Sequence, residues 1–231
     1  MKRALVAVLF GCLTVGTGSL AMAFDNDQAA ITVHLSPIPQ GGKVCDNAPT
    51  VDSKTIVSRL DAPNFCNDAG QTEFSVWLLI CNGSDSTGIA GAEFGIEYGP
   101  GLLLSTWSRC VDQDFPENNW PDSGTGNTVV WSLVTNCQNT NSEPFVPKTV
   151  VAIIGHLRAF VYGPEILQIT PKPNSGDAKV ADCDGAEESI FGQVPSHLGA
   201  AGFCYDGYNP CGLPTPVENK TWGAIKSGFG G

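Results

Sequence analysis

The sequence predicts an all-β protein: an antiparallel β-sandwich of jelly-roll or immunoglobulin-like type, stapled by disulfides and carrying long loops. Two observations predict this class. Apolar residues either form short runs or alternate with polar ones, as they do in β-strands. The 27 glycines and 16 prolines are scattered between these runs as turn residues, and no long helical pattern separates them. Short strands joined by turns are typical of a sandwich rather than of a parallel sheet.

The first four strands are expected at residues 29–36, 73–82, 92–98 and 102–107. Residues 29–36 show β-type alternation and end before Pro37. Residues 73–82 form a nearly continuous apolar run, which indicates a strand buried on both faces. Residues 92–98 alternate between apolar side chains and Glu or Gly, which indicates an antiparallel strand with one exposed face.

Four more strands are expected at residues 127–134, 149–162, 165–170 and 179–183. Residues 149–162 place their apolar side chains on one face of a long strand. Residues 111–127 are polar and rich in turn residues, which predicts a loop. Residues 187–198 have room for one or two helical turns, because Gly192 and Pro195 oppose a longer helix.

The N-terminus has the three parts of a secretory signal peptide. Two basic residues precede an apolar stretch, which ends in Ala21-Met22-Ala23. We therefore expect residues 1–23 to be removed, leaving residues 24–211 as one β-sandwich domain and residues 212–231 as a tail. Two alternatives are a membrane anchor, which the interspersed Gly, Ser and Thr residues disfavour, and lipoprotein cleavage at Cys12. The protein is expected in the extracellular space or the periplasm, with cell-surface association as an option, and without a membrane span after cleavage.

The cysteines predict an oxidised framework. Nine are present, and eight remain once Cys12 leaves with the signal peptide. An even number in an exported chain indicates disulfides, whereas zinc ligands usually come in closer pairs than any found here. Short polar loops favour the pairs Cys110–Cys137 and Cys45–Cys66. The eight cysteines are Cys45, Cys66, Cys81, Cys110, Cys137, Cys183, Cys204 and Cys211.

The charge balance excludes some partners. The chain has 12 basic and 23 acidic residues, and loss of Lys2 and Arg3 moves the net charge from −11 to −13. Nucleic acids and anionic membranes attract cationic surfaces, so we expect neither as a partner. An extracellular protein or a polysaccharide is expected instead.

Residues 88–98, the following Gly-Pro turn and residues 102–104 resemble a pattern in cohesin-like domains of extracellular bacterial proteins. Residues 150–162 lie where such domains place a long hydrophobic strand. The resemblance implies a jelly-roll-like sandwich, and it is also shared with carbohydrate-binding-type β-sandwiches. Eight cysteines depart from typical cohesins, so no dockerin partner and no cohesin contact residue are carried over. The segment 214–226 is similar to the tail of exported bacterial proteins without assigned activity.

No catalytic residue is predicted. His34, His156 and His197 lie in strand or turn patterns without a recognisable nucleophile motif. Glu93 and Glu97 lie on one face of a strand at a spacing of about 13 Å, too far apart for a glycosidase pair.

The predicted binding surface is an aromatic loop. Its alternative interpretation is that the two tryptophans cover one end of the core. Aromatic faces beside amide and carboxylate groups are suited to a sugar or a protein partner. The candidate binding residues are Trp107, Phe115, Trp120, Asn119 and Asp122.

No cofactor is predicted, with calcium as an option. Asp112, Asp114 and Glu117 are close in sequence, and carboxylate oxygens are the ligands that calcium takes. Their spacing does not match an EF-hand loop, so solvated loop charge is the competing interpretation. The sequence as a whole predicts a secreted, non-catalytic module with a surface, adhesion or assembly role. The alternatives are a carbohydrate-binding module and an extracellular hydrolase.

Overall fold

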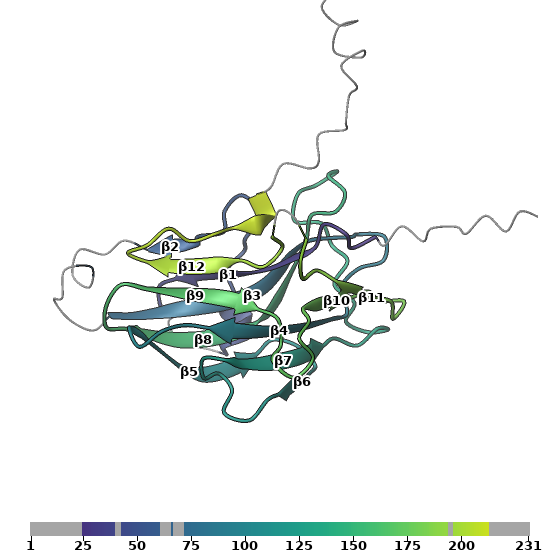
Figure 1. Cartoon of the computed structure of the whole chain (residues 1–231). Coiled ribbons are helices and arrows are strands. Elements are labelled where there is room, and N and C mark those ends of the chain that lie inside the picture. Colours follow the sequence, from purple (N-terminus) through teal and green to yellow (C-terminus); the bar gives the residue numbers. More distant parts are fainter. Residues whose placement is uncertain (1–24, 40–42, 61–65, 67–71, 194–195, 213–231) are drawn as a thin grey trace, which may run out of the picture.

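A computed structural model describes residues 25–39, 43–60, 66, 72–193 and 196–212. The signal peptide predicted at residues 1–23 and most of the tail predicted at residues 212–231 lie outside them. The described chain forms two β-sheets packed face to face, with β4, β9 and β12 in front of the fainter β3 and β8 in Figure 1. The predicted all-β sandwich is therefore confirmed.

The smaller sheet has four antiparallel strands in the order β1-β3-β8-β5. Its core-facing side chains alternate along each strand, as period-two patterning requires. Val76, Leu78 and Ile80 of β3, for example, are fully buried in the main core. The strands are β1 (Ala30–Ser36), β3 (Thr72–Gly83), β8 (Val150–Val161) and β5 (Leu102–Arg109).

The larger sheet has eight strands arranged around β4. One side of β4 pairs with β7, which in turn pairs with β6. The other side of β4 pairs with β10 at its start and with β9 at its end. β10 then pairs with β11, while β9 pairs with β12, which pairs with β2. The strands are β4 (Gly91–Glu97), β7 (Thr125–Val130), β6 (Gln113–Pro116), β10 (Lys179–Ala181), β11 (Glu187–Ser189), β9 (Glu165–Thr170), β12 (Ala200–Phe203) and β2 (Arg59–Leu60).

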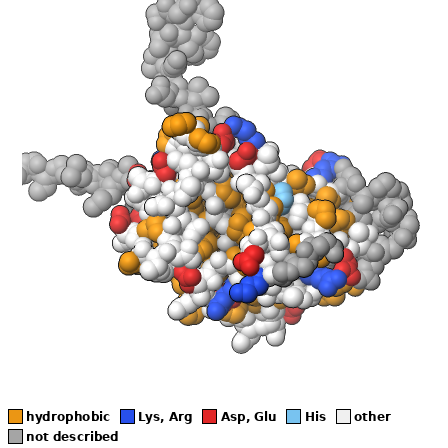
Figure 2. Space-filling view, turned by 180° about the vertical axis from the view of Figure 1, so that it is seen from behind, with side chains coloured by type: hydrophobic (Ala, Val, Ile, Leu, Met, Phe, Trp, Pro, Cys, Tyr) orange, Lys and Arg blue, Asp and Glu red, His pale blue; other side chains and the backbone are white. Residues whose placement is uncertain are grey.

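A strap, residues 43–58, covers part of the outer face of the small sheet. It begins with the short 3-10 helix η1 (Val44–Asn47), and its Val51 and Ile56 form a second buried cluster with Leu79 of β3. The amide of Leu35 donates to the carbonyl of Val57 at 2.8 Å. This cover explains why β3 is buried on both faces, as its apolar run predicted. Seen from behind, hydrophobic side chains lie in small groups among polar ones (Figure 2).

Several predicted elements need correction. The helical turns expected in residues 187–198 are wrong, because residues 187–189 form β11 and pair with β10. A tight turn allows this pairing: the Asp182 carboxylate accepts the amides of Asp184 and Ala186, and Gly185 takes a positive φ of 86°. β7 ends at Val130 and not at residue 134, and residues 113–116 of the predicted loop form β6.

All eight predicted cysteines are in disulfides, but the two predicted pairs are wrong. The bonds span sequence separations of 46 to 138 residues, because the sheets bring the ends of distant strands together. A preference for closing short loops does not select the partners here. The pairs are Cys45–Cys110, Cys66–Cys204, Cys81–Cys211 and Cys137–Cys183. Within the described ranges, no helix is long and apolar enough to cross a membrane.

Candidate functional site

A groove crosses the outer face of the large sheet. Its floor is one row of cross-strand neighbours, so it runs across the strands and not along them. The row passes over β6, β7, β4, β10 and β11. Its members, in order, are Gln113, Val130, Gly91, Ala181 and Glu187.

Small residues at the centre of the row make the groove hollow. Gly91 has no side chain, and its neighbour Ala181 has only a methyl group, whereas both ends carry long polar side chains. Two adjoining cavities of 460 and 80 Å³ lie over this row and share Val130, Ala181 and Glu187. A Cβ atom at Gly91 would lie 3.1 Å from the Val129 carbonyl oxygen. The glycine thus permits both tight strand packing and the depression above it.

One wall is the next row of the same sheet, which joins Phe115, Thr128, Glu93 and Lys179. Charges in this wall are largely compensated. The Lys172 ammonium lies 3.7 Å from the Glu93 carboxylate, and the Lys179 ammonium lies 3.3 Å from Glu187. The hydrogen bond and charge of Glu187 raise the pKa of Lys179 above its usual value.

The side of the groove opposite this wall carries two carboxylates, each of which accepts hydrogen bonds from backbone amides. Asp112 accepts the amide of Ser132 at 2.6 Å, and it also accepts the side-chain amide of Asn136 at 3.1 Å. Asp182 accepts the two amides of the turn before β11 at 3.0 and 2.8 Å. Both residues line the larger cavity with Leu133. The groove therefore combines an apolar floor with oriented acceptors.

The predicted aromatic loop is divided by the fold. Trp107 and Trp120 pack against the core, with their ring centroids 5.5 Å apart, and Trp120 lies 5.8 Å from Phe94. Phe115 is on the other side of β6, where it is 56% exposed in the groove wall. Asn119 and Asp122 are exposed in the turn between β6 and β7.

The three carboxylates considered for calcium, Asp112, Asp114 and Glu117, each bond to different partners. Asp112 binds the residues named above, and Glu117 accepts the amides of Gly126 and Asn174. Asp114 accepts the Trp107 indole N–H at 2.8 Å and pairs with Arg109 at 2.9 Å. Burial raises the pKa of Asp114, but the hydrogen bonds from Arg109 and Trp107 outweigh it and hold that pKa below its usual value. Among the described residues, no group of three acidic, His or Cys side chains is placed to hold a metal ion.

The three histidines are buried away from the groove. His34 accepts the Val57 amide of the strap on Nδ1 at 3.1 Å. His156 shares a 2.9 Å hydrogen bond with Ser75 and lies against the Trp77 ring, with centroids 4.8 Å apart. Burial lowers the pKa of His34, His156 and His197.

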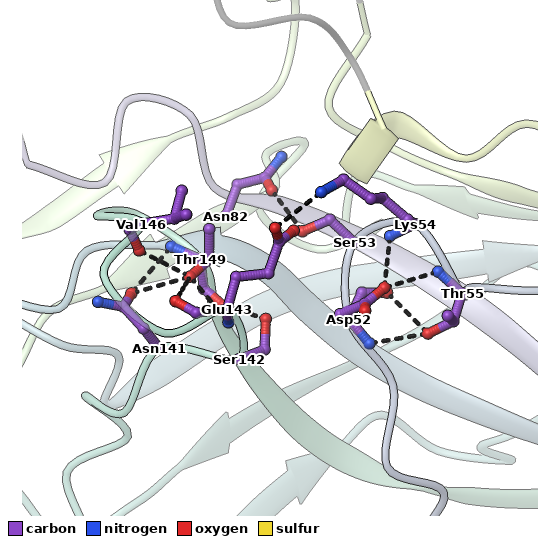
Figure 3. A network of polar contacts seen from close by, with 10 residues as sticks. All are labelled: Asp52, Ser53, Lys54, Thr55, Asn82, Asn141, Ser142, Glu143, Val146 and Thr149. Carbon is purple, nitrogen blue, oxygen red and sulfur yellow. Dashed lines mark hydrogen bonds and ion pairs between the residues drawn. The ribbon is translucent and has the colours of Figure 1, made fainter.

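A second cleft, of 570 Å³, lies between the strap, the 143–149 loop and the 3-10 helix η2 (Pro210–Gly212). Figure 3 shows the polar network that shapes its wall. Lys54 and Glu143 point toward each other and form an ion pair of 2.7 Å. The buried Thr149 hydroxyl donates to the Val146 carbonyl at 2.9 Å and holds the loop in place.

The structure is a β-sandwich held by four disulfides, with a groove on its large sheet. A cohesin module from a family 33 glycoside hydrolase of Clostridium perfringens is similar, with 13% identity over 76% of this chain and 97% of that one, at a TM-score of 0.41. The sixth cohesin of scaffoldin B from Acetivibrio cellulolyticus, solved in complex with a dockerin, is also similar. It has 11% sequence identity, the match covers 68% of this chain and 90% of that one, and the TM-score is 0.37. These modules are of the class that residues 88–104 resemble in sequence. No family model and no curated protein matches the chain.

Proposed function

We propose that this chain is an exported, non-catalytic binding module with a surface, adhesion or assembly role, and that the groove holds its extracellular ligand. The observation that carries the proposal is the pair of adjoining cavities over the row of five strands: Gly91 lines the smaller cavity, and Ala181 lines both. A cavity of 460 Å³ is within the range of about 300–1,000 Å³ found for ligand sites.

The state of the acidic groups supports binding rather than chemistry. Glu93 and Glu187 are in ion pairs, while Asp112 and Asp182 hold the backbone of the loops that shape the groove. These carboxylates therefore stabilise the shape of the site.

Export is supported by the eight bonded cysteines, because disulfides persist in oxidising compartments. We propose that signal peptidase cleaves after Ala23, that residues 24–211 are one domain and that residues 212–231 are a tail. Mass spectrometry of the secreted protein tests the cleavage site, because the mature chain should begin at Phe24.

Substitution of Ala181 tests the groove. We expect Ala181→Trp to fill the hollow, because its side chain lines both cavities. The secreted protein is incubated with insoluble polysaccharides and with immobilised extracellular proteins, and the retained fraction is measured. Ala181→Trp should lose retention about tenfold or more, a difference of about 1.4 kcal/mol.

Ile166→Trp is the matched control. Ile166 is exposed on β9 of the same sheet and lines neither groove cavity. This variant should bind as the parent does. Equal retention of both tryptophan variants, with unchanged thermal unfolding, would exclude the groove as the binding site.

A further inference from the structure

We infer that the groove takes an uncharged, hydroxyl-rich polymer, namely a segment of a neutral polysaccharide. This inference rests on the proposed binding function and names the ligand class. Three properties of the groove lead to it: its charge, its direction across the sheet and the chemistry of its surface.

The charge of the groove disfavours anionic ligands. Among the described residues of the groove, the ammonium groups of Lys172 and Lys179 are paired with Glu93 and Glu187, so neither is available to hold an anionic polymer. The remaining carboxylates, Asp112 and Asp182, accept hydrogen bonds from backbone amides. These hydrogen bonds leave the negative charge of both carboxylates in place, so the charge of the groove argues against an anionic polymer, and the direction of the groove is what argues against a peptide.

The direction of the groove disfavours a peptide bound through its main chain. A peptide that adds to a sheet lies parallel to an edge strand and hydrogen-bonds to it. The groove instead crosses five strands, from Gln113 of β6 to Glu187 of β11. Four inter-strand spacings give a length of about 19 Å, which accommodates several sugar rings and exceeds a monosaccharide.

The surface of the groove has the two kinds of group that a sugar ring needs. Ala90, Val130 and Leu133 line the larger cavity with apolar surface for the C–H faces of the rings, and Leu133 is half exposed. Asp112, Asp182 and Gln113 offer polar atoms to hydroxyl groups along the same cavity. Because the backbone holds both aspartates, their acceptors need little reordering on binding.

The test uses calorimetry to measure the affinity of the secreted protein for three classes of probe. These are neutral oligosaccharides (gluco-, xylo-, manno- and chito- series), the polyanion polygalacturonate, and a lysine-rich peptide. We expect binding to at least one neutral series, with affinity increasing with chain length and little changed by salt. Leu133→Ala and Gln113→Ala, which shorten two side chains that line the larger cavity, should each weaken it by about tenfold. Phe145→Ala, which removes a fully exposed ring on the 143–149 loop outside the groove, should leave it unchanged.

The outcomes separate this inference from the proposed function. If the peptide or polygalacturonate binds instead, and Ala181→Trp abolishes that binding, the ligand class is wrong and the groove remains the site. If neutral oligosaccharides bind equally well to the parent and to Ala181→Trp, both statements are wrong. Failure of every neutral series to bind while a protein ligand requires the groove also overturns the polysaccharide.

Discussion

The role of Trp120 depends on the side chains that surround it in the fold. Its ring lies edge-on to Phe94 and to Trp107, and all three pack against the core. Its indole nitrogen is buried without a hydrogen-bond partner among the described residues. The sequence offered Trp120 both as a binding residue and as a cover for the core, and its packing favours the second role. Phe115, five residues earlier, has the exposure that a contact residue needs.

We therefore predict that Trp120→Ala mainly affects stability. Removing a large, partly buried aromatic side chain should lower the free energy of unfolding by about 3 kcal/mol, because a cavity is left against Phe94. Urea denaturation measures this change, and Phe115→Ala is the control, with an expected loss of about 0.5 kcal/mol or less. A stable Trp120→Ala protein that loses ligand binding would contradict this prediction and support the aromatic loop as the binding surface.

At the scale of elements, the strap makes the small sheet different from a bare sandwich face. It contributes Val51 and Ile56 to a second core, and its Val57 amide bonds to a buried histidine. A neutral His34 can accept that bond on Nδ1, but a protonated imidazole has no acceptor there. The attachment of the strap therefore depends on the protonation state of His34.

This arrangement predicts a loss of stability in mild acid. Burial lowers the pKa of each histidine below its ordinary 6.5, so the unfolded chain takes up protons first as the pH falls. The contribution of the three histidines to the free energy of unfolding is fully present above pH 6.5. It decreases as the pH falls from 6.5 toward the lower pKa values of the folded state. Thermal unfolding between pH 7.5 and 5 measures the decrease, and His34→Gln should make it smaller.

Other groups act in separate ranges or in the opposite direction. Hydrogen bonds lower the pKa of Asp52 and Asp85 below 3.8, so their stabilising effect is lost only in stronger acid. Burial raises the pKa of Glu188 above 4.5, which favours the folded state as the pH falls. The test is therefore the difference in pH dependence between the parent and His34→Gln, and not the pH dependence of the parent alone. If His34→Gln keeps the full pH dependence, and NMR titration gives His34 an ordinary pKa, this account of the strap is wrong.

At the scale of the whole molecule, the four disulfides join segments that are distant in sequence. They differ in burial. Cys81 and Cys211 are both almost fully buried, whereas the cysteines of the other three bonds are partly exposed. Because thiol–disulfide exchange requires access to sulfur, the Cys81–Cys211 bond is the protected one.

Reduction under native conditions should therefore follow a fixed order. We expect a mild thiol to open Cys45–Cys110 before Cys81–Cys211, which should survive until global unfolding. Alkylation of the freed thiols followed by peptide mass spectrometry gives the order directly. The same treatment in denaturant is the control, where the two bonds should open at similar rates. Early loss of Cys81–Cys211 in the native protein would show that η2 detaches locally.

The sequence predicted most of the fold but little of the site. Periodicity located the long strands, such as residues 149–162, because each carries its own pattern. It missed β2 and β12, which are short and depend on their neighbours for pairing. It also missed the groove, since Gly91 and Ala181 are ordinary small residues until the β4–β10 register brings them together.

The sequence by itself determined the fold class, the even set of cysteines and the acidic charge, because each follows from residue type and local pattern. The tertiary structure alone decided which cysteines pair, that Trp107 and Trp120 pack on the core, and where the outer face becomes hollow. These features depend on contacts between residues far apart in the chain. Local chemistry predicts strands, but only the register between strands creates a site.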